Sequence, residues 1–243
     1  MLATDYSTAE SRPSRRVREP ASVDQPDAFA GSLPPGATRT VAAKDHVFCE
    51  GDVATHVYRV ELGHVCIYRM LPDGRRQVID FAYPGDLIGL GDVGEHTASA
   101  QATNLTRLSC YPITVVWEQA RRDVGHGLKL YQAMANELAA ARDLLVTVSQ
   151  RSACERVASF LLALSRRNLR RGGNPDEIVL PMTRADIADF LGLTIETVSR
   201  TFTKFRLAGL IDLEQCILVT IRDPKGLTRI AAGKPDLGHS LAS

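Results

Sequence analysis

The spacing of hydrophobic and polar positions changes along the chain, and each change predicts a different kind of element. From residue 37 to 122, short runs such as His56–Val60 and Val65–Tyr68 alternate between apolar and polar side chains. Turn dipeptides such as Gly51-Asp52 and Asp73-Gly74 separate these runs. Alternation broken by regular turns is typical of short antiparallel strands. This segment therefore predicts an antiparallel barrel or jelly roll.

Between residues 123 and 150 the period lengthens to that of a helix. Apolar residues recur at alternating spacings of three and four, which gives a seam with a period of about 3.5 residues. The seam consists of Tyr131, Met134, Leu138, Ala141, Leu145 and Val148. A helix that packs on its own domain usually shows a broader apolar stripe, and this alternative stays open. The narrow seam with polar flanks favours a helix that packs against a partner helix.

Two short helices joined by a tight turn are predicted from residue 183 to 209. Thr183 is a suitable N-cap, and Asp186 three residues later completes a start that resembles a capping box. Gly192 stands where a glycine commonly ends a helix. Thr194 then provides the N-cap of a second helix. The pattern predicts a helix–turn–helix motif.

The second of these helices has two different faces. Val198, Phe202 and Phe205 repeat at helical spacing and should point inward. The other face is polar and carries Glu196, Ser199, Arg200 and Thr203. A DNA-binding helix–turn–helix uses its second helix in this way, with the apolar side anchored and the polar side in the major groove.

Glu196 and Arg200 on that face have the chemistry needed to read a G·C base pair. A glutamate accepts a hydrogen bond from cytosine N4, and an arginine donates to guanine O6 and N7. The alternative is a solvated ion pair between residues four apart on a helix. The two-helix pattern around them favours base reading.

The sequence around this motif predicts a winged helix domain from 151 to 232. A helix should begin near Ala153, a basic loop should run over 166–173, and a short strand over 178–182. Two β runs at 210–213 and 216–221 predict a hairpin, and a short helix follows from 227 to 231. The segments 1–36 and 233–243 lack hydrophobic periodicity and are expected to be disordered tails.

The composition and motifs of the chain exclude several classes of function and show no catalytic site. The 243 residues carry a formal net charge of +1, so DNA binding would depend on a local basic patch. No apolar run is long enough to span a membrane, and the N-terminus has no apolar signal segment. We therefore expect a cytoplasmic protein without a membrane partner. No nucleophile elbow, phosphate loop or paired carboxylates appear, so an enzyme is not expected.

The motif TRADIADFLGLTIETVSRTFTKF resembles the recognition motif of the CRP/FNR superfamily of transcription regulators, most closely that of the rhizobial FixK type. The resemblance implies an α+β fold with an N-terminal β-roll like that of cyclic-nucleotide-binding proteins, a long dimerisation helix and a C-terminal winged helix-turn-helix. It also implies binding to palindromes with TTGA-like half-sites, activation through RNA polymerase, and targets in low-oxygen respiration or nitrogen fixation.

The same resemblance assigns roles to individual residues. Glu196, Ser199 and Arg200 match base-reading positions, and Ile195 either packs or touches a thymine methyl group. Backbone contacts are expected from Thr183, Arg184, Thr197 and Lys204, where Lys204 is alternatively a solvated charge.

Cofactors are not expected. In cyclic-nucleotide binders a Glu and an Arg-Ser pair follow the segment that reads PGDLIG here, but Leu90 and Ala98 occupy the Glu and Arg positions. The cysteines at 49, 66, 110, 154 and 216 include no N-terminal group like that of oxygen-sensing members, and neither they nor the histidines show metal-site spacing. A regulator that senses an unidentified effector in the β-roll remains the alternative function.

Overall fold

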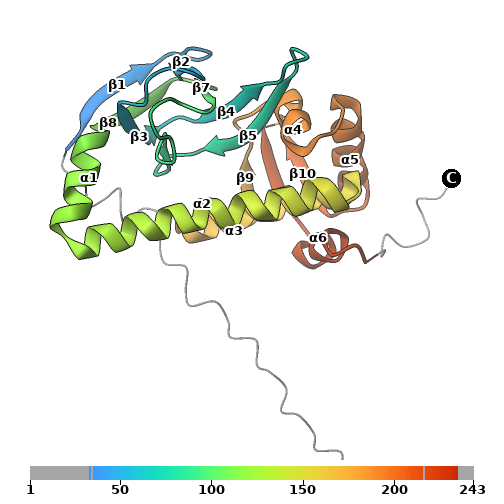
Figure 1. The fold of residues 1–243 in the computed structure, drawn as a ribbon. Helices are drawn as coiled ribbons and strands as arrows, with labels where there is room; N and C mark the ends of the chain where they lie inside the picture. The colour runs from blue at the N-terminus through green and yellow to red at the C-terminus, as the bar shows by residue number, and fades with distance from the viewer. Residues whose placement is uncertain (1–32, 34, 216, 235–243) are drawn as a thin grey trace, which may run out of the picture.

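The computed structural model describes residue 33, residues 35–215 and residues 217–234. A β-roll and a helical C-terminal unit lie side by side along one long helix, α2 (Val124–Gln150), which runs beneath both (Figure 1). The predicted α+β architecture is therefore confirmed.

Two four-stranded antiparallel sheets form the roll, with strand orders β1-β8-β3-β6 and β2-β7-β4-β5. The strands are β1 (Ala37–Val41), β2 (His46–Phe48), β3 (His56–Leu62), β4 (Val65–Met70), β5 (Arg76–Ala82), β6 (Leu87–Ile88), β7 (Ser99–Ala102) and β8 (Thr106–Pro112). Side chains from both sheets meet between them, with Val60 and Leu108 on one side and Val65 and Ala100 on the other. This two-sheet core explains the alternation of the sequence, because one face of each strand is buried.

The segment 1–36 is not wholly a tail without structure. Leu33 is buried in a small cluster with Val57, Tyr111 and Leu130. The expectation of a disordered tail is wrong at this position, because an apolar side chain fills a gap between the roll and the helices that follow it. Residues 35, 36, 233 and 234 are described as well, and the remainder of the tails predicted over 1–36 and 233–243 lies outside the described residues.

Helix α1 (Ile113–Arg122) follows β8 directly and was not predicted. Helix α2 then ends at Gln150, and Ser152 caps α3 (Ala153–Arg170) by accepting a hydrogen bond from the Glu155 N–H group. The basic loop predicted over 166–173 is therefore wrong for most of its length. Basic residues are favourable in the last turn of a helix, where they face the negative end of its dipole.

The C-terminal unit is a winged helix. Its remaining elements are β9 (Glu177–Val179), α4 (Arg184–Leu191), α5 (Ile195–Leu207), β10 (Ile211–Glu214), β11 (Leu218–Ile221) and α6 (Pro224–Ala231). The strands form a three-stranded antiparallel sheet in the order β10-β11-β9. The predicted hairpin is present as β10 and β11, and the strand predicted over 178–182 is shorter and begins one residue earlier.

The roll and the winged helix share one hydrophobic core. Cys66, Val78 and Phe81 of the roll belong to the same buried cluster as the apolar side chains of α3, α4 and α5. The ring centroids of Phe81 and Phe190 are 5.4 Å apart, which is contact distance for an aromatic pair. Apolar contact therefore holds the two units together, and it joins residues such as Phe81 and Phe190 that lie far apart in the chain.

Candidate nucleic-acid interface

Helix α4 is closed at both ends by local hydrogen bonds. The Thr183 hydroxyl accepts from the Asp186 N–H group at 3.1 Å, and the Asp186 carboxylate accepts from the Thr183 N–H group at 2.8 Å, which confirms the predicted capping box. At the other end Gly192 has a φ of 62°, a left-handed conformation that glycine adopts without strain. Arg156 of α3 donates to the Leu191 carbonyl at 2.9 Å and thereby satisfies one of the last carbonyls of the helix.

Helix α5 is anchored by its apolar face, as predicted. Thr194 caps it by accepting from the Thr197 N–H group. Val198, Phe202 and Phe205 are buried in the core of the winged helix. Because this side is fixed in the core, the opposite side of α5 must face solvent.

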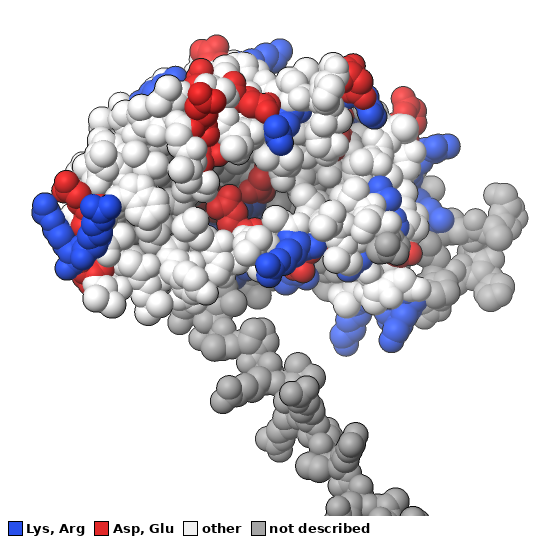
Figure 2. Space-filling model, in the orientation of Figure 1, with Lys and Arg blue, Asp and Glu red and all other residues white. Residues whose placement is uncertain are grey.

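The solvent-facing side of α5 carries the residues predicted to read bases. The exposed residues in its first two turns are Ile195, Glu196, Ser199, Arg200 and Thr203, and Ile195 is 48% exposed. A shallow open depression lies along the same face, between Ser199 and Leu207. Figure 2 shows Lys and Arg side chains at the end of the molecule where α5 and α6 lie. The face is therefore exposed, and two basic side chains, Arg200 and Lys204, line its depression.

Glu196 and Arg200 both remain available to an external partner. In the part of the chain that the structure describes, no ion pair within 4.0 Å joins them. The pKa of Glu196 is lowered by hydrogen bonds from its own N–H group and from the Thr194 hydroxyl, with a smaller effect from Arg200. Glu196 is therefore ionised at neutral pH and can act as an acceptor.

The residues predicted to contact the DNA backbone surround this face, and several are engaged within the protein. The Thr183 hydroxyl belongs to the capping box, and the Thr197 hydroxyl shares a hydrogen bond with that of Thr194. The guanidinium of Arg184 lies over the ring of Phe202. Lys204 is half-exposed beside Arg200 in the depression.

The predicted seam of α2 faces solvent in the single chain. Tyr131 is 71% exposed and Leu145 70%, and Met134, Leu138 and Ala141 are exposed as well. Val148 is half-buried near Gly192. A row of exposed apolar side chains of this length is unusual on a monomer and is typical of an interface.

Trp117 of α1 extends this exposed apolar surface. It is 45% exposed and lines a groove between α1 and α2 together with Leu130, Tyr131 and Met134. The sequence analysis missed this residue because it did not predict α1. The apolar spacing of Val116 and Ala120, four residues apart, was a signal that could have revealed the helix.

Leu90 and Ala98, the two residues that differ from the cyclic-nucleotide pattern, are packed against the rest of the roll. Leu90 packs against the cluster that contains Val57 and Tyr111, and Ala98 is buried. Nearby, the Asp92 carboxylate accepts from the N–H group and the hydroxyl of Thr97, at 3.1 and 2.8 Å, and lies 2.7 Å from His96 Nδ1. A carboxylate of the chain itself thus occupies the hydrogen-bond donors of this loop.

The cysteines differ in their burial. Cys66 and Cys110 are buried and Cys154 packs against the core, whereas Cys49 is exposed. Burial raises the pKa of the Cys66 thiol to about 12, so this thiol is protonated at neutral pH. Among the described residues, no group of three or more His, Cys, Asp or Glu side chains is placed to hold a metal ion, and no helix is long and apolar enough to cross a membrane.

Both halves of the chain match known protein families. Residues 38–122 match the family model of the cyclic nucleotide-binding domain, and residues 155–230 match that of the Crp-like helix-turn-helix domain. The nitrogen fixation regulation protein FixK of Bradyrhizobium diazoefficiens is 41% identical over 187 residues, which cover 76% of this chain and 78% of that protein.

Other relatives agree with this match. The transcriptional activatory protein AadR of Rhodopseudomonas palustris is 38% identical over 78% of this chain and 79% of its own length. The solved structure of FixK2 from Bradyrhizobium japonicum superimposes with a TM-score of 0.76 at 32% identity, covering 80% of this chain and 96% of that one.

Proposed function

The chain belongs to the CRP/FNR family of transcription regulators and resembles the FixK regulators of nitrogen fixation, and from this premise we propose that it binds palindromic DNA as a homodimer and activates transcription. Its helix-turn-helix domain is the DNA-binding part. Its relatives are regulators, and a regulatory rather than an enzymatic role follows for this chain.

The exposed pair of Glu196 and Arg200 on an anchored helix carries the proposal. Because the apolar side of α5 is buried, the helix enters a major groove with Glu196 and Arg200 facing the base edges. Arg200 then donates to guanine O6 and N7, while Glu196 accepts from N4 of the paired cytosine. Ser199 lies between them, and Ile195 reaches a thymine methyl group from the start of the helix.

The backbone contacts fix the register of the helix on the duplex. Thr197 and Lys204 flank the reading face, and Arg184 sits at the start of α4. Phosphate contacts of this kind carry no sequence information but position the protein. The site is a TTGA-like half-site, in keeping with the resemblance of the motif to the FNR branch.

A homodimer formed along α2 has two-fold symmetry, and this symmetry matches a palindromic DNA site. Two copies related by a two-fold axis place their α5 helices in successive major grooves, about 34 Å apart. The exposed row from Tyr131 to Leu145, with half-buried Val148 at its end, supplies the apolar surface for this contact. A bound dimer recruits RNA polymerase, and the FixK relatives point to genes of nitrogen fixation or low-oxygen respiration as targets.

We further propose that the roll acts without a cyclic nucleotide. A cyclic phosphate needs a cation or free N–H donors, and in this loop Asp92 already occupies the Thr97 donors. Leu90 adds an apolar side chain where a ribose partner would stand. The roll is thus a scaffold for the dimer and for the winged helix, and no cofactor is needed.

A binding titration tests the proposed function. Full-length protein is titrated against a labelled duplex with two TTGA-type half-sites in inverted orientation, and against a scrambled duplex of the same composition at the same salt concentration. We expect the palindrome to bind at least about a thousandfold more tightly. Equal affinities for the two duplexes would contradict sequence-specific binding.

A further inference from the structure

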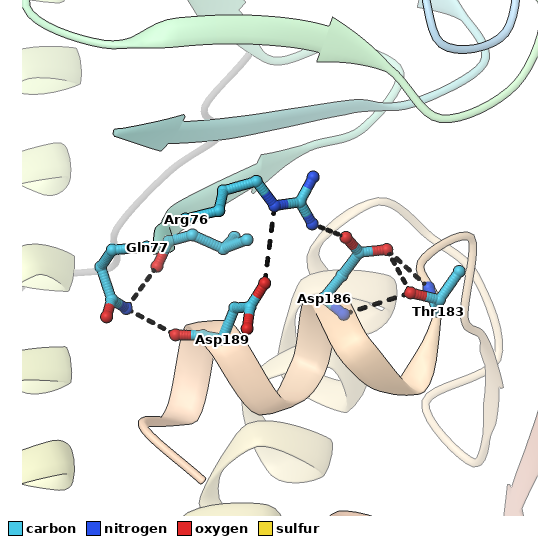
Figure 3. A network of polar contacts seen from close by, with 6 residues as sticks. Arg76, Gln77, Thr183, Asp186 and Asp189 are labelled. Carbon is cyan, nitrogen blue, oxygen red and sulfur yellow. Dashed lines mark hydrogen bonds and ion pairs between the residues drawn. The ribbon is translucent and has the colours of Figure 1, made fainter. Parts of the chain in front are cut away.

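The first two residues of strand β5, Arg76 and Gln77, form polar contacts with helix α4 of the DNA-binding unit. The Arg76 guanidinium forms an ion pair with Asp186 and lies 3.5 Å from the Asp189 carboxylate (Figure 3). Gln77 donates from Nε2 to the main-chain carbonyl of Asp189 at 2.5 Å. These two neighbouring residues of the roll thus bind both the side chains and the backbone of one helix.

A second group of contacts joins the roll to α3. Asp86, in the turn between β5 and β6, accepts from Arg167 at 2.8 Å and from Arg171 at 2.5 Å. Arg167 also donates to the Phe81 carbonyl at 3.0 Å and lies over the ring of Tyr83, 4.7 Å from its centroid. The C-terminal end of α3 is therefore fixed to the same sheet edge that binds α4.

Together these contacts hold the winged helix in one orientation relative to the roll. One group binds α4, the other binds α3, and the pair of Phe81 and Phe190 packs between them. Three separate points of contact leave little freedom for rotation. The reading face of α5 stays exposed in this arrangement, so the contacts do not block access to DNA.

The burial of the charges argues against a purely stabilising role. The side chains of Arg76 and Asp186 are 28% and 13% exposed, so both lose much of their hydration. The cost of removing these charges from water offsets much of their Coulombic attraction, so the pair adds little net stability; in some proteins such pairs instead specify one arrangement of the packed elements. Asp186 is in addition the capping-box partner of Thr183, so Arg76 acts directly on the start of the helix-turn-helix.

We propose that Arg76, Gln77 and Asp86 of the β-roll are positioning residues that set the angle of the recognition helix and thereby the spacing of the two half-sites. This proposal rests on the proposed function, since it presupposes a dimer on a palindrome. The roll in this chain thus takes part in DNA recognition by holding the reading helix, without touching DNA itself.

The test measures discrimination between spacers. Affinities of the full-length dimer are compared for the palindrome and for versions with one base pair inserted or removed between the half-sites. One base pair rotates one half-site by roughly 34° relative to the other. Arg76→Ala should bind the parent palindrome more weakly, and its discrimination against the shifted spacers should fall by roughly fivefold or more relative to wild type.

The neighbouring residue provides a matched control. Arg75 pairs with exposed Asp73 in the hairpin turn and, among the described residues, forms no ion pair with the winged helix, so Arg75→Ala removes the same charge and should keep wild-type discrimination. Preference for the base pair assigned to Arg200 should stay unchanged in all these variants, because the reading face is intact.

The results separate this proposal from the function on which it rests. If wild type does not prefer the palindrome, the proposed function fails. If wild type prefers it and Arg76→Ala discriminates spacers as Arg75→Ala does, or binds the parent site more tightly, the positioning role is overturned. Should Arg76→Ala lose its folded circular dichroism spectrum, Gln77→Ala is used in the same assay, because it removes only hydrogen bonds, and unchanged discrimination there overturns the role equally.

Discussion

The guanidinium carbon of Arg184 lies 3.8 Å from the centroid of the Phe202 ring. This contact joins the first residue of α4 to the buried side of α5, so it crosses the turn between the two helices of the motif. Phe202 is only 1% exposed, partly because Arg184 covers it. A residue expected to contact a DNA phosphate thus also fixes the geometry of the two helices.

Substitutions of Arg184 should separate these two roles. Arg184→Ala removes both the cover of the ring and the charge, and should lower the free energy of unfolding by about 1 kcal/mol as well as weaken DNA binding. Arg184→Met retains an apolar cover and should keep most of the stability. Urea unfolding and DNA titration at several salt concentrations measure the two effects.

The salt dependence gives the decisive comparison for Arg184. If the residue contacts a phosphate, Arg184→Met should weaken binding to all sequences alike and reduce the salt slope by about one per protomer. An unchanged slope would leave Arg184 with its structural role alone.

The base-reading pair should respond differently to truncation of each member. Arg200→Ala should lose about 1–3 kcal/mol of discrimination at its base pair in each half-site. Glu196→Ala should lose less affinity, because it removes a negative charge near phosphates, but should relax the choice at the same base pair. Titration against single-base variants of the palindrome measures both effects. If Glu196→Ala keeps the wild-type base preference, base reading by Glu196 is wrong.

The α2 seam predicts a specific change of oligomeric state. Leu138→Glu places a charge in the centre of the apolar row, and burying it unpaired would cost several kcal/mol per chain. We expect monomers in sedimentation experiments. Val146→Glu is a matched control, because Val146 is 53% exposed and Leu138 52%, but Val146 lies outside the seam. A dimeric Leu138→Glu protein would refute the seam without affecting the reading face.

Asp92 should make the stability of the roll depend on pH. Burial raises the pKa of this carboxyl, but the hydrogen bonds with His96 and Thr97 outweigh burial and hold the pKa below its usual value. The carboxylate therefore stabilises the fold above its unfolded pKa of about 3.9, and this contribution is lost as pH falls through the lower folded pKa.

Asp92→Asn should accordingly destabilise the protein at pH 7 by about 1 kcal/mol, and the difference from wild type should shrink at about pH 3. Glu95→Gln, an exposed change in the same loop, controls for loss of charge. Urea unfolding at the two pH values is the measurement. A difference of the same size at both would show that the Asp92 charge does not stabilise this loop.

Cyclic AMP should neither bind nor activate. Leu90 is packed in an apolar cluster, Ala98 offers no cation, and Asp92 would repel the cyclic phosphate. Isothermal titration calorimetry with full-length protein should show no binding heat, and the DNA titration should be unchanged by the nucleotide. A micromolar dissociation constant would contradict this reading of the loop.

Local patterns were read correctly from the sequence where the contacts that form an element lie within a few residues. The capping box of Thr183 and Asp186 spans three residues, and Val198 and Phe202 are one helical turn apart. The family motif added the roles of Glu196 and Arg200, which the structure leaves exposed. The sequence pattern did not predict helix α1 or the burial of Leu33. A short helix directly after a strand shows little periodicity, and a single apolar residue in a tail shows none.

The sequence by itself predicted a domain of short antiparallel strands, a long helix with an apolar seam and a winged helix-turn-helix, because each follows from spacing along the chain, and the family resemblance identified the strand domain as a β-roll. Only the tertiary structure decided how the roll holds the reading helix. Arg76 and Asp186 lie 110 residues apart, and no spacing rule links them. Arg167 and Arg171 were predicted to lie in a basic loop, whereas the fold places Arg167 in the last turn of α3 and Arg171 at its C-cap, where both pair with Asp86. Charges find their partners through the packing of whole elements, and a linear pattern does not contain that packing.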